Sequence, residues 1–550
     1  MSDELSVRCV ASAQDEDPAK DAAYWQLTPK NQCDTVTIFV DRRKIIPVLF
    51  LPGIMGTNLK NKKLGGDPVW SPPNNIFSGI VTLLEYLGKN ASRRAAELDP
   101  DATQVDDGGT INNAPLLESH EAQHIRHWGE IYSKCYHPFM ARLQSRLNRV
   151  YSEHTFSGKR PLVNNWEEML KHDPLLSGQV TQKGALVKPC LTQAELDHIN
   201  HFRFEVWAGG YNWLQSNAKS AEAIERRIDE IIGFYKEGLL ATKKVLIITH
   251  SMGGLVARAL VQQLKDEAQN KILGVIHGAM PANGAAETYA NMRQGIKGLM
   301  GYVVGKDAEQ VTAVLGYAQG GLELLPFGGR YCMEETLGVP WLYFKENGNG
   351  KYLPTGDNPY DEIYKEKKWY GLIPSANEAK IPKKQTAPEE DAEKTRLTFR
   401  EKFEDTIESV KVFHDTIRGK YFPDTFAFWG CDDALPAVGA VSWDAMPLGK
   451  KTAPPQDITD TGKGVVFDGA RWCKLVEHKN PGDGTVPYAS WKKDRALPRM
   501  TFLHGKAKQP ALSGTAGYEH QAAFNDERAL WVSLYGAVKL FSEQAPLPGK

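Results

Sequence analysis

One serine lies where a strand is predicted to turn sharply into a helix. Residues 243–260 read KKVLIITHSMGGLVARAL, with Ser251 at the centre. The apolar run before Thr249 suits a strand buried on both faces of a parallel sheet. Apolar residues at helical spacing follow Gly254, so this pattern predicts a strand–turn–helix elbow that exposes the Ser251 hydroxyl. A serine held in this way is a nucleophile for acyl transfer, and a serine that merely caps a helix is the alternative.

The neighbours of Ser251 bear on how the negative charge of an acyl intermediate would be stabilised. Gly253 keeps the small residue two positions after the serine, whereas Thr249 stands where the usual pattern has glycine. In an elbow of this kind, the backbone N–H of the next residue, here Met252, donates to the oxyanion. A second donor comes from an early loop after a strand, and Ile54, which follows Pro52-Gly53, is the candidate.

A nucleophilic serine needs a base and a carboxylate, which follow it in the order acid then histidine in this kind of fold. Asp483 lies between Gly482 and Gly484, in a tight turn near the predicted last strands. It is therefore the preferred acid. Asp432 and Asp433 also follow a predicted strand and are the rival acids, while an ordinary Asp-Gly turn is the alternative for Asp483.

Two histidines follow Asp483, and either is a candidate for the base. His504 closes the predicted last strand, and His520 begins the predicted last helix after a loop of small residues. The loop after the final strand is where the base belongs, so His520 is preferred over His504. A histidine without a catalytic role is the alternative for both. His250 is expected to be a structural residue that points away from the elbow.

The predicted elements alternate in a way that fits a parallel sheet with helical crossovers. Apolar runs predict strands at 36–40, 45–51, 202–207, 245–248, 272–276, 425–429 and 500–503, and helical spacing predicts helices at 128–151, 221–236 and 519–541. Pro138 is expected to kink or interrupt the helix at 128–151. A strand at 465–467 is expected to form a hairpin with 438–443. The fold class is therefore α/β, namely an α/β-hydrolase fold with a mostly parallel sheet, flanking helices and large cap or lid insertions.

The chain is expected to divide into four parts. Residues 1–34 form a polar N-terminal lead-in, 35–284 the first part of the hydrolase core with an insertion at about 60–200, 285–420 a cap or lid insertion, and 421–550 the second part of the core. Residues 285–329 are rich in glycine and apolar residues. A lid over an apolar acyl site needs an apolar face of this kind, and an ordinary helix packed on the core is the alternative.

Composition excludes several classes of function. The 66 basic and 67 acidic residues are nearly balanced among 550, so no nucleic-acid partner is expected. The first 20 residues lack the apolar core of a signal peptide, and no apolar run is long enough to cross a membrane. The seven cysteines are scattered and lack metal-ligand spacing, so neither a metal nor a cofactor is expected. The acidic residues at 99–107 do not match an EF-hand and are expected to form a solvated loop.

Four motifs together resemble those of one lipase family. They are LPGIMG at 51–56, YNW at 211–213, THSMG at 249–253 and GDGTVP at 482–487. The chain resembles the lecithin–cholesterol acyltransferase-like and GPI inositol-deacylase-like lipases. In that family the Pro-Gly loop sets the oxyanion hole, and the aspartate of GDGTVP is the triad acid. With the YEHQ motif at 518–521, the chain is similar to the bacterial type VI secretion lipase effectors of the fourth family.

The resemblance implies a serine acyl-ester hydrolase of phospholipase A type, acting on membrane phospholipid as an antibacterial toxin. It also implies a cognate immunity protein and a secretion apparatus as partners. Such a protein would be made in the cytoplasm, exported without a signal peptide and active in the periplasm of a target cell. Two other functions remain open: a lipid acyltransferase with the same triad, and a catalytically silent module that binds lipid or protein.

Overall fold

The structure is a computed structural model of the chain. It describes residues 8–14, 20–26, 35–41, 43–72, 89–112, 116, 120–152, 160–171, 174–182, 184–235, 238–328, 330–331, 339–346, 349–353, 355–356, 358–378, 399–447, 465–468, 471–490, 498–505 and 517–544. Parts of the expected lead-in at 1–34 and of the expected cap insertion at 285–420 lie outside these residues.

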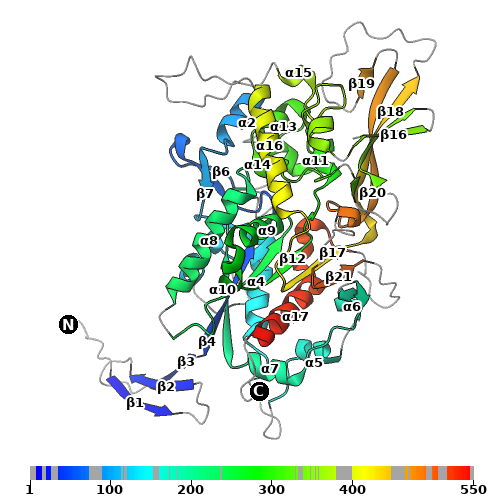
Figure 1. The fold of residues 1–550 in the computed structure, drawn as a ribbon. Helices are drawn as coiled ribbons and strands as arrows, with labels where there is room; N and C mark the ends of the chain where they lie inside the picture. The colour runs from blue at the N-terminus through cyan, green and yellow to red at the C-terminus, as the bar shows by residue number, and fades with distance from the viewer. Residues whose placement is uncertain are drawn as a thin grey trace.

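The central sheet runs in the order β10–β4–β11–β12–β17–β21–β8–β9 (Figure 1). Its strands are β4 (Lys44–Leu51), β8 (Gln179–Gln182), β9 (Ala185–Leu186), β10 (Phe202–Ala208), β11 (Val245–His250), β12 (Ile272–Gly278), β17 (Thr425–Gly430) and β21 (Met500–His504). From β10 to β21 all neighbours are parallel, and β8 and β9 add an antiparallel edge. This sheet confirms the predicted mostly parallel α/β fold.

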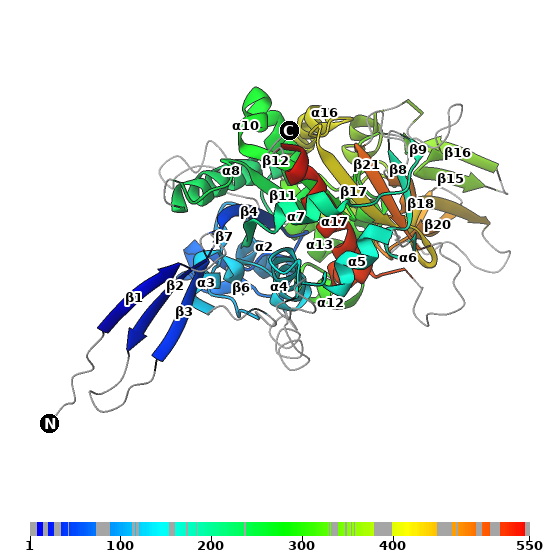
Figure 2. The same cartoon turned by 90° about the horizontal axis from the view of Figure 1, so that it is seen from below.

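Alternate side chains of the sheet enter two separate cores, one on each face. On β4, Leu49 and Leu51 belong to one core, and Val48 and Phe50 belong to the other. The first core includes α8 (Asn217–Phe234), α9 (Gly253–Leu264) and α16 (Phe399–Ile417), and the second includes α4 (Ser133–Leu147) and α17 (Glu527–Gln544). Figure 2 shows α17 from below, where it packs against α4, α6 (Pro174–Ser177) and α7 (Gln193–Ile199). Burial on both faces explains the unbroken apolar runs of these strands.

Two predicted helices differ from the observed ones. Pro138 lies inside α4, which continues to Leu147 without a break. The lost bond would have reached the carbonyl of Lys134 in the first turn, and α4 buries Phe139 and Leu143 beyond the proline. The expected helix at 519–541 begins instead as the 3₁₀ turn η7 (His520–Asn525), followed by α17. This turn places His520 before the helix rather than within it.

A second sheet lies beside the first, in the order β16–β15–β18–β20–β19. Its strands are β15 (Leu342–Glu346), β16 (Asn349–Leu353), β18 (Asp432–Pro447), β19 (Val465–Asp468) and β20 (Arg471–Gly482). The expected hairpin of 465–467 with 438–443 is wrong, because β20 lies between β19 and β18. The long β18–β20 ribbon begins directly after β17 and returns to the central sheet at Gly482.

Helices from the expected cap insertion pack on the same core as the elbow helix. They are α11 (Ala286–Gln294), α12 (Gly298–Val303), α13 (Ala308–Leu315) and α14 (Gln319–Leu322). Met292, Val311 and Leu322 are buried in the core that contains α9. These helices are therefore packed in this structure, and their movement as a lid stays a prediction.

The described residues also form smaller elements. They are the sheet β1 (Arg8–Gln14), β2 (Lys20–Gln26) and β3 (Thr35–Asp41), the sheet β5 (Leu59–Asn61), β6 (Pro68–Trp70) and β7 (Thr103–Val105), the pair β13 (Arg330–Tyr331) and β14 (Val339–Pro340), and the helices α2 (Ala91–Glu97), α3 (His120–Ile125), α5 (Asn164–Lys171), α10 (Ala268–Lys271) and α15 (Ser375–Glu378). In the expected acidic loop, Asp106 lies 3.4 Å from the ammonium of Lys60, and Asp99 lies 3.7 Å from that of Lys63.

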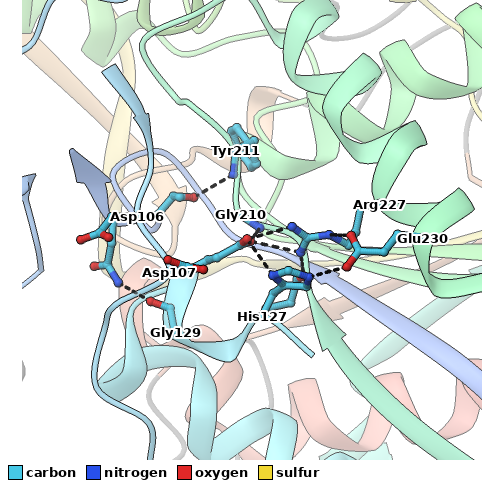
Figure 3. A network of polar contacts seen from close by, with 12 residues as sticks. Asp106, Asp107, His127, Gly129, Gly210, Tyr211, Arg227 and Glu230 are labelled. Atoms are coloured by element: carbon cyan, nitrogen blue, oxygen red, sulfur yellow. Dashed lines mark hydrogen bonds and ion pairs between the residues drawn. The ribbon is translucent and has the colours of Figure 1, made fainter. Parts of the chain in front are cut away.

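A buried ion pair holds the loop after β10 in place (Figure 3). Glu130 is 4% exposed; it accepts from Arg227 Nη2 at 2.8 Å and from the Gly210 amide at 2.9 Å. Burial alone would raise the pKa of Glu130, but His127 and Arg227 together hold it below its ordinary value. The adjacent Tyr211 donates its hydroxyl to the Pro52 carbonyl at 2.7 Å. The Pro52-Gly53 loop is therefore braced from the β10 side.

Candidate active site

Ser251 lies on a strained turn between β11 and α9. Its φ is 51°, in the left-handed region that L-residues avoid at a cost of about 1–2 kcal/mol. The Ser251 amide donates to the Gly278 carbonyl at 2.9 Å, which fixes the turn against the end of β12. A Cβ on Gly253 would lie 2.5 Å from the Pro52 carbonyl oxygen, so only glycine fits two residues after the serine. The geometry is that of the predicted nucleophile elbow.

The threonine that replaces the usual glycine is accommodated by the neighbouring strand. Thr249 Oγ1 and His277 Nδ1 share a hydrogen bond of 2.8 Å, and both residues are buried. Burial, together with the charge of Arg258, lowers the pKa of His277 to about 3, so its ring is neutral. The polar threonine side chain is therefore satisfied inside the sheet, and the departure from the usual pattern leaves the elbow intact.

Ser251, His520 and Asp483 form a continuous hydrogen-bonded chain. His520 Nε2 lies 2.8 Å from Ser251 Oγ, and His520 Nδ1 lies 2.8 Å from Asp483 Oδ2. The other carboxylate oxygen, Oδ1, accepts from the amides of Thr485 at 3.1 Å and Val486 at 2.7 Å. All three members of the chain are buried, at 4%, 5% and 1% exposed, respectively.

This arrangement assigns the proton positions. The carboxylate of Asp483 accepts, so Nδ1 of His520 carries the hydrogen, and the bare Nε2 accepts from the Ser251 hydroxyl. The His520 amide also donates to the Asp483 carbonyl at 2.9 Å, which fixes the ring relative to the acid through the backbone. In this state the histidine is ready to take the serine proton.

The rival residues occupy other positions. Asp432 accepts from the amides of Ala434, at 2.8 Å, and Gly517, and thus holds the segment that leads to His520, while Asp433 is exposed. His504 is buried at the end of β21, where its Nδ1 bonds to the Tyr518 hydroxyl at 2.9 Å. Burial lowers the pKa of His504 to about 3. The structure therefore brings Asp483 and His520, and not these rivals, to Ser251.

The two predicted oxyanion donors lie on either side of the nucleophile. A Cβ on Gly53 would lie 3.0 Å from Ser251 Cβ, so the loop that carries Ile54 rests against the serine. Met252 is the next residue of the elbow and caps α9. Within the part of the chain that the structure describes, neither the Ile54 nor the Met252 amide donates to another protein atom. Both amides are therefore free to donate hydrogen bonds to an oxyanion, and this role stays a prediction.

Three residues near the triad were missed or underrated by sequence reasoning. Tyr136 and His250 form a buried polar chain behind Ser251, and Glu287 of α11 lies close enough to feel the charges of His520 and Asp483. Burial and the neighbouring carboxylates raise the pKa of Glu287 to about 7. Tyr136 reads in the sequence as one more apolar residue of a helix, and Glu287 follows no motif. For His250, the available signal in the sequence was its position directly before Ser251.

Comparisons with known proteins agree with this geometry. The family model of the PGAP1-like alpha/beta domain matches residues 214–297, which include the elbow. A chain of the crystal structure of the Tle4–Tli4 complex is 32% identical, with a TM-score of 0.75, and the match covers 90% of this chain and 98% of that chain. The chain belongs to the Tle4 family. No curated protein matches it by sequence.

Membership of the Tle4 family confirms the resemblance read from the motifs. The protein is a PGAP1-like hydrolase with the α/β-hydrolase fold, and a lipase effector of the type VI class. Among the described residues, no helix is long and apolar enough to cross a membrane, and no group of three histidine, cysteine or acidic side chains is placed to hold a metal ion.

Proposed function

We propose that this Tle4-family protein is a serine acyl-ester hydrolase that cleaves a fatty acyl ester of membrane phospholipid. The observation that supports it most is the chain from Ser251 Oγ to His520 Nε2, at 2.8 Å, and from His520 Nδ1 to Asp483 Oδ2, at 2.8 Å, on a strained elbow. A catalytically silent binding module would not need a strained serine that is held against a correctly oriented base.

In the proposed reaction, Ser251 Oγ attacks the acyl carbonyl as His520 Nε2 takes its proton. The oxyanion accepts hydrogen bonds from the backbone amides of Met252 and Ile54, and Asp483 stabilises the imidazolium. His520 then returns the proton to the alcohol oxygen of the lysolipid, which leaves. Water then attacks the acyl carbonyl as the same nitrogen takes its proton. That proton passes to Ser251 Oγ as the bond between this oxygen and the acyl group breaks, and the fatty acid is released.

The similarity to the Tle4–Tli4 complex supports a proposal about a partner protein. The relative was crystallised as a Tle4–Tli4 complex, and we propose that this chain likewise binds a cognate immunity protein. We further propose that it is made in the cytoplasm, exported by a secretion apparatus that needs no signal peptide, and active at the membrane surface in the periplasm of a target cell.

Covalent labelling tests the nucleophile. A fluorophosphonate should label the native protein, and Ser251→Ala should abolish labelling because no other hydroxyl contacts His520 Nε2 among the described residues. Labelling of the native protein that persists in Ser251→Ala would mean that the nucleophile lies elsewhere. A native protein that never labels would favour a silent binding module.

Product analysis tests the substrate and the rival acyltransferase activity. Vesicles of defined phospholipids should yield free fatty acid and lysolipid in equal amounts, in a reaction lost with Ser251→Ala. The same assay with a long-chain alcohol should still yield free fatty acid. Ester formation on the alcohol in place of fatty acid would favour the acyltransferase.

A further inference from the structure

A second hydrogen-bonded chain lies behind the triad and joins its two loops. The Gly53 amide donates to the Tyr136 hydroxyl at 3.2 Å. That hydroxyl lies 3.0 Å from His250 Nδ1, and His250 Nε2 lies 3.0 Å from the His520 carbonyl oxygen. The chain therefore runs from the residue before the candidate donor Ile54 to the backbone of the base.

The direction of every bond in this chain is fixed. A carbonyl can only accept, so His250 Nε2 carries a hydrogen, and in a neutral ring Nδ1 is then the acceptor. The Tyr136 hydroxyl accepts from Gly53 and must donate its own hydrogen to His250 Nδ1. His250 Nε2 must then carry the ring hydrogen and donate it to the His520 carbonyl. A single tautomer of a neutral ring satisfies this order.

The surroundings of the chain hold His250 in that neutral state and keep water away. His250 is 0% exposed and Tyr136 is 1% exposed. The Tyr136 ring lies 5.0 Å from that of Phe50, and the His250 ring lies 5.5 Å from that of Phe524. Burial, and the charge that His520 can carry, hold the pKa of His250 well below its ordinary value. A protonated Nδ1 would reverse the bond to Tyr136 and place a charge in this buried site, so the neutral ring is the state that the site favours.

The same position makes the chain relevant to catalysis. The rings of His250 and His520 are 4.8 Å apart between their centroids, so a neutral His250 adds no repulsion when His520 becomes an imidazolium. The Gly53 loop lies against Ser251, and a misplacement of about 1 Å in such a loop can cost about a hundredfold in rate. The hydrogen bonds of the Tyr136 hydroxyl go to Gly53 and His250, so it acts on Ser251 and His520 only through these neighbours.

We propose that Tyr136 and His250 are positioning residues that hold the oxyanion loop and the backbone of the base at a fixed separation on either side of Ser251. The proposal rests on the proposed function, because it assigns a role within that reaction. Removal of either link should leave substrate binding in place but displace the groups that act only in the transition state.

Kinetics of Tyr136→Phe on a short-chain ester test this role, because the substitution removes one hydroxyl and keeps the ring. We expect kcat to fall roughly tenfold to a hundredfold with KM unchanged. Tyr235→Phe is the matched control: its buried hydroxyl bonds to Trp207 and Glu205, far from the triad, and kcat should stay at the native value. A Tyr136→Phe variant with native kcat, or with a loss confined to KM, would overturn the proposal.

A double-mutant cycle separates positioning from simple loss of stability. His250→Gln can donate to the His520 carbonyl through its amide nitrogen and should retain more kcat than His250→Phe, which breaks both bonds. Because Tyr136 and His250 act in one chain, the double variant Tyr136→Phe/His250→Phe should lose no more kcat than His250→Phe alone. Additive losses, or equal kcat for His250→Gln and His250→Phe, would contradict the proposal. If the native protein itself showed no labelling or turnover, the proposed function would fail first.

Discussion

At the scale of single residues, the site depends on which histidine and which aspartate reach the serine. Both candidate histidines are buried, but they have different partners: His520 bonds Ser251 and Asp483, whereas His504 bonds Tyr518. Asp432 is likewise buried but holds backbone amides. Side chains of the same type thus have different partners, and only His520 and Asp483 are linked to Ser251.

Substitution at these positions should separate the two sets. We expect Asp483→Asn and His520→Ala to lower kcat by roughly 10³-fold or more, because the imidazole loses its orientation or is absent. His504→Ala should lower the thermal midpoint, since it leaves the Tyr518 hydroxyl without its partner, but the folded protein should keep its fluorophosphonate labelling rate. Steady-state kinetics on a short-chain ester check this. Loss of activity in His504→Ala alone would make His504 the base.

The sequence predicted these residues to the extent that motifs carry them. Ser251 and Asp483 lie in short patterns whose glycines are required by close backbone approach, as at Gly253 and Gly482, or by a positive φ, as at Gly484. His520 followed from chain order. The position of Tyr136 beside the site could not be predicted, because its hydroxyl bonds to His250, which is 114 positions away in the sequence. Residue type and local spacing contain no information on such a contact.

At the scale of elements, the acid is delivered by a long ribbon that local patterns hide. β18 extends over 16 residues and pairs with β20, which ends at Gly482 immediately before Asp483. The pairing register shifts around Pro436 and Gly439, where a proline lacks a donor and a Cβ would strike the Asn480 side chain. These interruptions explain why the sequence predicted only a short strand here and paired it with the wrong partner.

One buried arginine joins the elbow helix α9 to the end of α16 and to the loop after β12, and this link gives a prediction. Arg258 of α9 donates to the carbonyls of Ala282 at 2.7 Å, Ile417 at 2.6 Å and Lys420 at 3.1 Å. Arg258→Met should lower the thermal midpoint by several degrees, because buried carbonyls lose donors worth about 1–3 kcal/mol each. Arg226→Met, at an exposed position of α8, is the control and should leave the midpoint unchanged. Equal midpoints for the two variants would contradict the role of Arg258.

At the scale of the whole molecule, the six parallel strands were predictable and the edges were not. Strands such as β11 and β12 are buried along their whole length, so their sequences are continuous apolar runs. β8 is a four-residue strand whose partner β21 lies more than 300 residues later. Its short polar sequence has no hydrophobic periodicity, and it becomes a strand only by pairing with β21 in the assembled sheet.

The stability of the whole molecule should also depend on pH through Glu287, on the helix that joins the cap to the site. The pKa of Glu287 is raised from 4.5 to about 7 by burial and by Glu477 and Asp483. The folded state therefore favours the neutral carboxyl, and this contribution is complete below about pH 4.5 and lost as the pH rises through about 7. Between about pH 5 and pH 8, the thermal midpoint of the native protein should fall relative to that of Glu287→Gln, which stays neutral. Parallel curves for the two proteins would show that Glu287 does not carry this dependence.

The order of the strands in the central sheet has a consequence for how the protein comes into being. Translation produces Ser251 and its elbow first, then Asp483, and His520 last of the three. The base reaches the serine only after β21 has been added beside β17, on the far side of β12. Until the segment that carries His520 has been synthesised, we expect Ser251 to have no histidine to take its proton. We therefore expect no ester hydrolysis from the chain before that stage of synthesis.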